Sequence, residues 1–249
     1  MGTGYDPTVG ILADAKAVLS ELESSLTDQS GQRDGVARAK TVKDAKHDRL
    51  EELRVSSSPL TSVSVIETVR DATPRDTVIT ADAGGLRVWM LTAMEAYDLQ
   101  SYVNPGSWAS MGTAYPAAIG AKTANPDRDV VALVGDGGFM MCVHELHTAV
   151  SENIPVTVIV CNNSDYAIIS NSAEREYHLD EGTFSWDETP VTFTTVAEGM
   201  GMDASRVHTT SELESAVTDA IGATEPTLIE VMTDPNEPQA GDWMSSHPE

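Results

Sequence analysis

Residues 129–138, DVVALVGDGG, decide the fold because a short apolar run ends there in glycines. A continuous apolar strand is typical of a parallel sheet covered on both faces. Glycines after it let the main chain approach a phosphate at the start of the next helix. Many α/β proteins have a plain tight turn at this place, and Asp136 is what makes this turn specific. A carboxylate facing a phosphate would repel it unless a cation lies between them.

A second apolar run, residues 155–161 (PVTVIVC), leads into Asn162, Asn163, Ser164 and Asp165. Neighbouring parallel strands end at the same edge of a sheet, so we expect this loop beside Asp136. Asparagine and main-chain carbonyl oxygens are hard ligands that suit Mg²⁺. The loop alone could be an ordinary Asn-rich turn. Together the two features predict a site for Mg²⁺ and a phosphate.

The rest of residues 59–249 alternates strand and helix patterns. Strands are expected at 77–81, 101–103, 129–134, 155–161, 206–208 and 227–232. Helices are expected at 63–71, 86–96, 114–124, 138–151, 192–199 and 211–221, with a less regular stretch at 164–190 and a frayed tail at 241–249. This order predicts an α/β fold, a doubly wound and mostly parallel sheet with helices on both faces.

The first 58 residues look like a lead-in to that domain. Residues 11–26 carry apolar side chains at spacings of three and four, which predicts an amphipathic helix; these are Leu12, Ala15, Leu19, Leu22 and Leu26. Residues 36–54 are charged and are expected to form a solvated helix or connector before the break at 56–59 (SSSP). We therefore divide the chain into segments 1–30, 31–58 and 59–249.

The charge balance excludes several kinds of partner. With 39 acidic and 15 basic residues, the net charge is -24. Such a surface repels nucleic acids and anionic membranes, and it suits a halophilic cytoplasm where salt screens self-repulsion. No apolar stretch approaches the roughly 18 residues of a membrane helix, and the N-terminus lacks a signal-peptide core, so a cytoplasmic protein is expected. Cys142 and Cys161 are predicted to be buried free thiols.

The sequence Gly135-Asp136-Gly137 is followed by Asn162-Asn163, so that Asn163 stands 27 residues after Asp136. This arrangement resembles the diphosphate and metal signature of thiamine diphosphate (ThDP) enzymes. The resemblance covers most of 59–235, the diphosphate-binding or PP domain, and is closest to acetolactate synthases and 2-oxo acid decarboxylases. Three further stretches carry it: 82–89 (DAGGLRVW) resembles a diphosphate loop, 106–121 (GSWASMGTAYPAAIGA) the segment against the aminopyrimidine, and 143–146 (VHEL) the following helix. Residues 9–26 resemble the last helix of the family's central domain.

The resemblance implies a role for each matching residue. Mg²⁺ would be bound by the side chains of Asp136 and Asn163 and by the main-chain carbonyl of Asp165. The contacts with ThDP would come from Gly84, Gly85, Ala109, Met111, Gly135, Gly137, Gly138, Asn163 and Tyr166. Met111 would have the catalytic role, because its side chain would lie under the thiazolium ring and impose the bent cofactor shape. Simple core packing is the alternative for Met111.

Two departures from the family pattern bear on function. The Gln-His pair of the synthase diphosphate loop is replaced by Gly85 and Leu86, so main-chain amides or Arg87 would have to substitute. The Gln-Trp-Glu cluster after the asparagine loop is replaced by residues 169–172 (ISNS), which leaves the substrate open. The activating glutamate of the family belongs to another, pyrimidine-binding domain, and no matching domain precedes residue 59.

The resemblance therefore implies that the chain is half of a 2-oxo acid decarboxylase or carboligase. The chain would be inactive alone and would need a pyrimidine-domain chain or a missing N-terminal half. It would act within a homo- or hetero-oligomer. The small subunit of a two-chain, sulfopyruvate-type decarboxylase and a non-catalytic ThDP-binding fragment are the alternatives. An iron–sulfur oxidoreductase subunit is disfavoured because two cysteines are too few for a cluster.

Two other features invite a functional interpretation. His144 and His147 flank Glu145, but their spacing differs from that of a zinc-binding helix, so surface histidines are expected. Trp186 and Asp187 lie in the irregular stretch and could line a substrate pocket, and a surface position for the tryptophan is equally consistent with the sequence.

Overall fold

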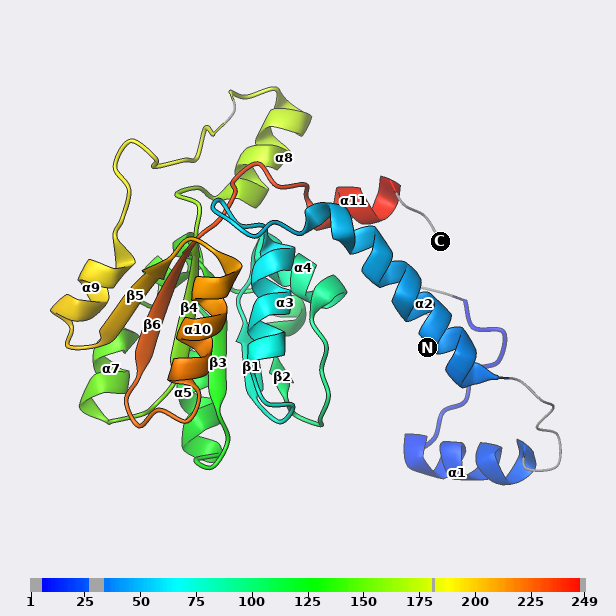
Figure 1. Cartoon of the computed structure of the whole chain (residues 1–249). Coiled ribbons are helices and arrows are strands. Elements are labelled where there is room, and N and C mark those ends of the chain that lie inside the picture. Colours follow the sequence, from blue (N-terminus) through cyan, green and yellow to red (C-terminus); the bar gives the residue numbers. More distant parts are fainter. Residues whose placement is uncertain (1–5, 27–33, 181, 247–249) are drawn as a thin grey trace. The chain divides into compact units, whose positions relative to one another are not determined.

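The computed structural model describes residues 6–26, 34–180 and 182–246. The chain separates into two units, Met1–Arg49 and Leu50–Glu249 (Figure 1). The predicted division of the first 58 residues into 1–30 and 31–58 stays a prediction.

The first unit contains helix α1 (Ala15–Leu26) and most of helix α2 (Gly35–Leu50). α1 begins four residues later than expected, where Asp14 Oδ1 accepts a hydrogen bond from the Ala17 amide at 3.0 Å and so caps the helix. Its leucines recur as predicted, but Leu19 and Leu26 are exposed and α1 buries no residue. α2 is highly charged and is exposed along nearly its whole length, as expected of a solvated helix.

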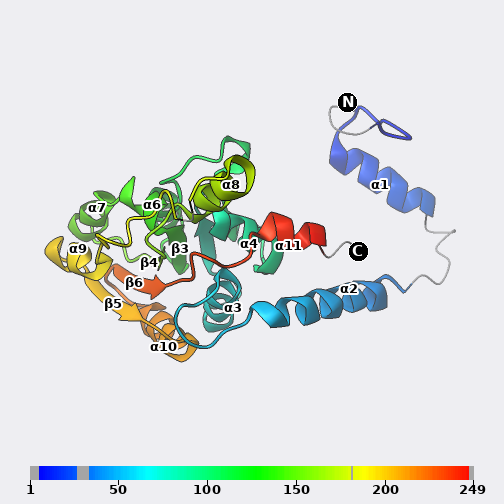
Figure 2. The same ribbon diagram turned by 90° about the horizontal axis from the view of Figure 1, so that it is seen from above.

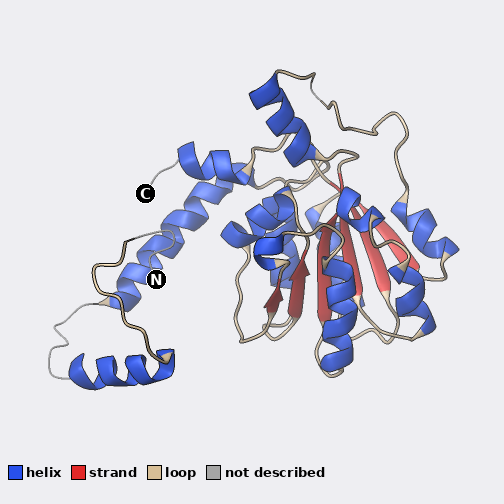
Figure 3. Cartoon of the chain, turned by 180° about the vertical axis from the view of Figure 1, so that it is seen from behind, coloured by secondary structure: helices blue, strands red, loops and turns tan. Residues whose placement is uncertain are grey.

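The second unit is built on one sheet of six parallel strands (Figures 1 and 3). The strands are β1 (Val78–Ala81), β2 (Tyr102–Val103), β3 (Val130–Gly135), β4 (Thr157–Asn162), β5 (Asp203–Val207) and β6 (Thr227–Met232). Their order across the sheet is β2-β1-β3-β4-β6-β5. The predicted parallel α/β fold is confirmed, and β5 begins three residues earlier than expected.

Helices cover both faces of the sheet. They are α3 (Ser62–Ala72), α4 (Gly85–Ala93), α5 (Ala114–Ala124), α6 (Asp136–Met140), α7 (Glu145–Ser151), α8 (Ala167–Tyr177), α9 (Phe193–Gly199), α10 (Thr210–Ala220) and α11 (Ala240–Ser246), with 3₁₀ turns η1 (Glu51–Leu53) and η2 (Gly106–Trp108). Side chains of β3 alternate between the faces: Val131 and Leu133 pack with α3, α4 and α10, and Val130, Ala132 and Val134 pack with α5, α7 and α9. This alternation explains why the strands are apolar throughout.

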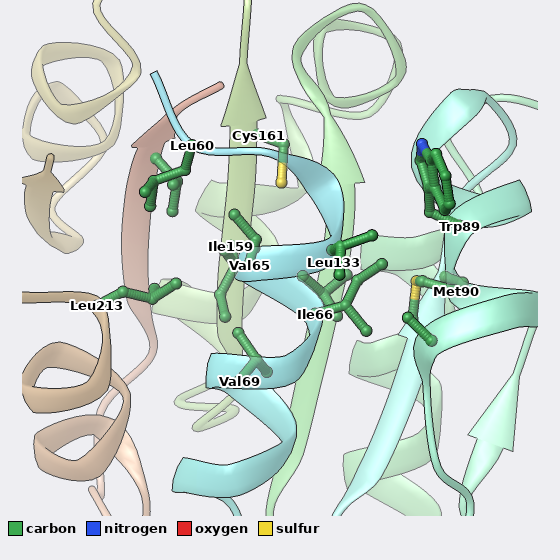
Figure 4. Close-up of a cluster of buried hydrophobic side chains, with 14 of the residues drawn as sticks. Leu60, Val65, Ile66, Val69, Trp89, Met90, Leu133, Ile159, Cys161 and Leu213 are labelled. Atoms are coloured by element: carbon green, nitrogen blue, oxygen red, sulfur yellow. The ribbon is translucent and has the colours of Figure 1, made fainter. Parts of the chain in front are cut away.

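Each face has its own apolar core. On the first, Val65, Ile66 and Val69 of α3 lie over Leu133 and Ile159 of the sheet (Figure 4). On the second, Phe139 packs edge-on between two rings, with centroids 5.9 Å from Tyr115 and 5.5 Å from Phe193. Each fully buried aliphatic or aromatic side chain stabilises the fold by about 1.5–3 kcal/mol. The two cores hold the carboxyl ends of the strands in fixed register.

Two expected elements differ inside the domain. The single helix predicted at 138–151 is two helices, because the turn between α6 and α7 is closed by tighter 3₁₀-type bonds, including Met141 N–H to Gly138 O at 3.1 Å and Glu145 N–H to Cys142 O at 2.9 Å. The stretch 164–190, predicted to be less regular, contains α8. α8 buries only Ser170 and Ala173, so it has almost no apolar face for a periodicity argument to detect.

The tail at 241–249 was predicted to be frayed, and for the described part this was wrong: α11 covers Ala240–Ser246. Trp243 is buried, its indole N–H donates to Glu52 Oε1 at 2.8 Å, and its ring lies 5.6 Å from that of Trp89. The packing of Trp243 therefore orders a segment that the sequence predicts to be a frayed tail. Residues 247–249 lie outside the described residues.

Three smaller expectations were tested as well. Cys142 and Cys161 are free and buried, as predicted, and burial raises the pKa of Cys142 to about 12. His144 and His147 lie exposed on the surface, also as predicted. Over the ranges that the structure covers, none of the helices is both long and apolar enough to span a membrane.

Candidate functional site

The sheet order places a switch point between β1 and β3. The chain leaves β1 toward β2 on one side and continues from β3 to β4 on the other. Ligands of doubly wound sheets bind in the crevice beyond the carboxyl ends of the strands at such a point. The loops that follow β1, β3 and β4 meet at this edge, below α8 and next to α4 and α6 (Figure 2).

Asp136 is the centre of this edge. Its side chain is buried, and its carboxylate accepts hydrogen bonds from three main-chain amides: Gly137 at 2.7 Å, Asn163 at 3.1 Å and Ser164 at 2.7 Å. The expected position of the asparagine loop beside Asp136 is therefore correct. Burial raises the pKa of Asp136 to about 6, against the opposing effect of the three amides. A bound cation would offset that cost of burial.

The loop beside Asp136 carries oxygen atoms of the kind that hard cations prefer. Within the described ranges no lysine, arginine or histidine pairs with Asp136. Asn163 is half-buried, and within the described residues its side-chain oxygen accepts one hydrogen bond, from the Asp165 amide at 3.1 Å. The Asp165 carboxylate turns toward α8 and accepts the Ser170 hydroxyl at 2.6 Å, whereas its main-chain carbonyl accepts no hydrogen bond from the described residues. This donor set fits Mg²⁺.

Asn162 and Asn163 have different surroundings although they are adjacent. Asn162 is buried, and its amide donates to Glu230 Oε1 at 2.7 Å and to the Val191 carbonyl at 3.2 Å. Glu230 is itself fully buried and is paired with Arg206 at 2.9 Å. Asn162 therefore anchors the loop from behind, whereas the main-chain amide of Asn163 is hydrogen-bonded to Asp136.

The glycines after β3 stand where no side chain fits. A Cβ on Gly137 would lie 2.3 Å from the ring of Tyr166, and a Cβ on Gly138 would lie 2.1 Å from Asp82 Oδ2. The Gly138 N–H makes no hydrogen bond within the described part of the chain, so it is available to a phosphate. The Gly137 N–H is directed to Asp136 instead. Gly135, the last residue of β3, has open space around its Cβ position.

Asp82, the residue directly after β1, has a structural role that the sequence analysis missed. It is buried, and its carboxylate accepts hydrogen bonds from the amides of Gly112 at 2.9 Å, Thr113 at 2.7 Å and Ala114 at 3.2 Å. It fixes the start of α5 and thereby the end of the loop 106–112. An acid directly after an apolar strand, the same signal that singled out Asp136, could have identified it.

The loop 106–112 contains the predicted Ala109 and Met111. It turns on left-handed residues, with φ of 60° at Gly106, 50° at Ala109 and 74° at Gly112. Ala109 is exposed and Met111 is half-buried. A Cβ on Gly112 would lie 3.0 Å from the Cβ of Met141, so the loop lies directly against the end of α6.

The first glycine loop, Gly84 and Gly85, precedes α4. Gly84 has a φ of 132°, which disfavours other residues, and Gly85 begins the helix. Arg87 donates from Nη2 to the Gly106 carbonyl at 3.0 Å and so braces the loop 106–112. The ring of Trp186 lies 5.0 Å from that of Tyr166, which places it beside the glycine loop after β3. Among the predicted site residues, Ala109 is the one that is exposed.

Comparison with known proteins adds an independent finding. Residues 82–231 match the family described as the thiamine pyrophosphate enzyme, C-terminal TPP binding domain. The chain belongs to this family. The matched range includes Asp82, Asp136 and Asn163, and it confirms the predicted family and its ThDP-binding fold.

Relatives in this family are longer than the chain. A probable acetolactate synthase large subunit of Methanococcus aeolicus is 26% identical over 95% of this chain, and a putative thiamine pyrophosphate-containing protein of Bacillus subtilis is 27% identical over 96%. The chain spans 41% of the length of each. The ThDP-dependent 4-hydroxybenzoylformate decarboxylase of Rhodococcus jostii superposes with a TM-score of 0.67 and 29% identity, covering 74% of this chain and 34% of that enzyme.

Proposed function

We propose that this chain binds ThDP through Mg²⁺ and forms the diphosphate-binding half of a 2-oxo acid decarboxylase or carboligase of the acetolactate synthase type. The observation that carries the proposal is the buried Asp136 carboxylate, which faces Asn163 at the family's signature position without a paired cation among the described residues. ThDP, when bound, supplies an electron sink for breaking or making a carbon–carbon bond next to a carbonyl.

The residues of the chain would divide the binding task. The side chains of Asp136 and Asn163 and the carbonyl of Asp165 would hold Mg²⁺, which would neutralise the repulsion between Asp136 and the diphosphate. The free N–H of Gly138 would donate to a phosphate oxygen. The loop with Ala109 and Met111 would hold the ring part of the cofactor.

The chain is proposed to need a second component, a pyrimidine-domain chain or an N-terminal half. The comparison of lengths supports this, because the chain spans 41% of its relatives. The surface beside the loop 106–112 supports it as well: Trp108 is 90% exposed, and Met140 and Met141 are 46% and 51% exposed. Clustered exposed apolar side chains mark interaction sites on soluble proteins. An acid that activates the pyrimidine would come from that component.

We also infer a salt-rich cytoplasm as the setting of the protein. The inference is supported by the excess of 39 acidic over 15 basic residues. Dissolved salt screens the repulsion between such charges.

The proposed function is tested by 2-oxo acid consumption. The purified chain is assayed with pyruvate, ThDP and Mg²⁺ in high salt, alone and after addition of a pyrimidine-domain chain. We expect no turnover alone and turnover with the added chain. An Asp136→Asn chain with the same partner is the control and should stay inactive. Multiple turnovers by the chain alone would contradict the half-enzyme proposal.

A further inference from the structure

A buried glutamate interrupts the apolar sequence of β6, which reads TLIEVM. Glu230 is fully buried, and its carboxylate accepts hydrogen bonds from β5, α9 and β4. The donors are Arg206, from Nη2 at 2.9 Å and Nε at 3.1 Å, the Thr194 amide at 3.2 Å and Asn162 Nδ2 at 2.7 Å. The ion pair with Arg206 compensates the buried charge. The bond to Asn162 connects that charge with the loop after β4.

The bond to Glu230 decides how the Asn162 side chain is oriented. A carboxylate only accepts hydrogen bonds, and so does the Val191 carbonyl, which lies 3.2 Å from the same Asn162 nitrogen. Both neighbours therefore require the NH₂ group of Asn162, and its carbonyl oxygen is turned the other way, toward Ser164. That oxygen accepts from the Ser164 amide at 3.2 Å and from the Ser164 hydroxyl at 3.4 Å. Glu230 thus helps to set which end of the Asn162 amide meets Ser164.

Ser164 connects this network with Asp136. The Ser164 N–H is shared between Asn162 Oδ1 at 3.2 Å and Asp136 Oδ2 at 2.7 Å. Ser164 also has a φ of 57°, a left-handed conformation that a residue with a side chain keeps only where its surroundings hold it. The contacts from Asn162 are part of that hold. A continuous series of hydrogen bonds therefore runs from Glu230 through Asn162 and Ser164 to the Asp136 carboxylate.

We propose that Glu230 is a positioning residue for the cation site: it orients Asn162 so that the Ser164 amide holds the Asp136 carboxylate in the orientation that Mg²⁺ requires. Glu230 acts through Asn162 and is not itself a ligand. Partners that orient a metal ligand in this way typically change metal affinity by roughly 10–100-fold when they are removed. The inference rests on the proposed function, in which Asp136 binds Mg²⁺. The competing explanation is that Glu230 serves only the ion pair with Arg206.

The test separates metal affinity from stability. Arg206→Met leaves the Glu230 carboxylate buried without its cation, so it should lower stability the most, yet Asn162 keeps its acceptor. The double variant Glu230→Met with Arg206→Met removes both charges, so stability should recover, whereas Asn162 loses the carboxylate. Urea unfolding measures stability. Calorimetric titration of ThDP at a series of Mg²⁺ concentrations gives the Mg²⁺ concentration at which binding is half-maximal.

The half-maximal Mg²⁺ concentration should rise about tenfold or more in the double variant, and in Arg206→Met it should stay close to that of the wild type. The variant that is more stable would then bind the metal more weakly, which a merely structural role does not produce. Affinity that follows stability, lowest in Arg206→Met and recovered in the double variant, would overturn the role of Glu230. An unchanged Mg²⁺ dependence in the double variant would overturn it as well.

Glu230→Asp gives the same test if the double variant does not fold. It keeps a negative charge for Arg206 but draws the carboxylate back from Asn162 by one methylene, so the half-maximal Mg²⁺ concentration should again rise. An unchanged value, with Mg²⁺-dependent binding by the wild type, would overturn the role of Glu230 and leave the proposed function standing. Wild-type chain that binds no ThDP at any Mg²⁺ concentration would overturn the proposed function together with this inference.

Discussion

The carboxylate of Asp82 lies against the main chain of Gly138, so that a Cβ on Gly138 would stand 2.1 Å from Asp82 Oδ2. The same carboxylate accepts the amides of Gly112 and Thr113. One buried acid thus joins the loop after β1, the glycine loop after β3 and the end of the loop 106–112. These are the three loops to which we assign the diphosphate and the ring part of ThDP.

Substituting Gly138→Ala should disturb all three loops at once. The added methyl would displace Asp82, and the amides of Gly112 and Thr113 would lose their buried acceptor. We expect the unfolding free energy to fall by about 2–4 kcal/mol, the range for a steric clash with a buried hydrogen-bonded group, and the affinity for ThDP to fall as well. Denaturant unfolding and calorimetry measure the two effects.

Gly120→Ala is the control for that substitution. Gly120 lies within α5, is exposed, and has open space around its Cβ position. Alanine there should raise the unfolding free energy by about 0.5–1 kcal/mol through helix propensity. If Gly138→Ala were as well tolerated as Gly120→Ala, the close approach of Asp82 to Gly138 would be wrong.

The two adjacent asparagines should respond in opposite ways. Asn162→Ala removes the buried amide that bonds Glu230 and the Val191 carbonyl, so we expect a loss of about 2–3 kcal/mol in unfolding free energy. Asn163→Ala removes a half-buried side chain that bonds only the Asp165 amide, and should cost about 1 kcal/mol or less while abolishing Mg²⁺-dependent ThDP binding. Equal effects of both variants on stability and on binding would contradict the division between anchor and ligand.

Glu237 should make stability depend on pH. Burial raises its pKa to about 7, whereas glutamate in an unfolded chain titrates at about 4.3. Between these values the folded chain holds the proton more tightly, so the unfolding free energy contributed by this group falls as pH rises through the window and stays low above pH 7. Its full extent is roughly 3–4 kcal/mol.

Glu237→Gln isolates this effect, because glutamine resembles the protonated glutamate and does not titrate. The variant and the wild type should be similarly stable near pH 4, and the variant should be more stable by about 1–3 kcal/mol at pH 8. Urea unfolding of both proteins across this range measures the difference. A difference that is constant with pH would show that Glu237 titrates normally.

Salt should stabilise the chain because its acidic surface repels itself in dilute buffer. We expect the melting temperature to rise by several degrees or more between about 0.1 M and molar salt, since the Debye length shortens from about 10 Å to about 3 Å. Scanning calorimetry at several concentrations of potassium chloride measures it. A melting temperature independent of salt would refute the inference of a salt-rich setting.

The strands and the chemistry after them were predictable from the sequence because their signals are local. The runs before Gly135 and Asn162 are apolar on both faces, and the acid at Asp136 follows directly. The sheet order then brings the asparagine loop to Asp136, as two neighbouring parallel strands require. The pattern in residues 129–165 therefore predicts both the parallel sheet and the candidate metal site.

The elements that sequence reasoning missed depend on contacts between distant residues. α11 is ordered by the packing of Trp243 on Trp89, and the segment before it is held by the hydrogen bond from the Ser62 amide to Glu237. No periodicity within residues 234–246 indicates either contact. α8 was missed for a related reason, since it packs through Ser170 and Ala173 rather than through an apolar stripe.

Calorimetric titration of ThDP into the chain, with Mg²⁺ and then with a chelator, tests the central claim most directly. Asp136 stands buried where the diphosphate is proposed to lie, so the cofactor should bind with Mg²⁺ and show no detectable binding after chelation. Asp136→Ala should show none under either condition. ThDP binding of equal affinity with and without the metal would contradict the account.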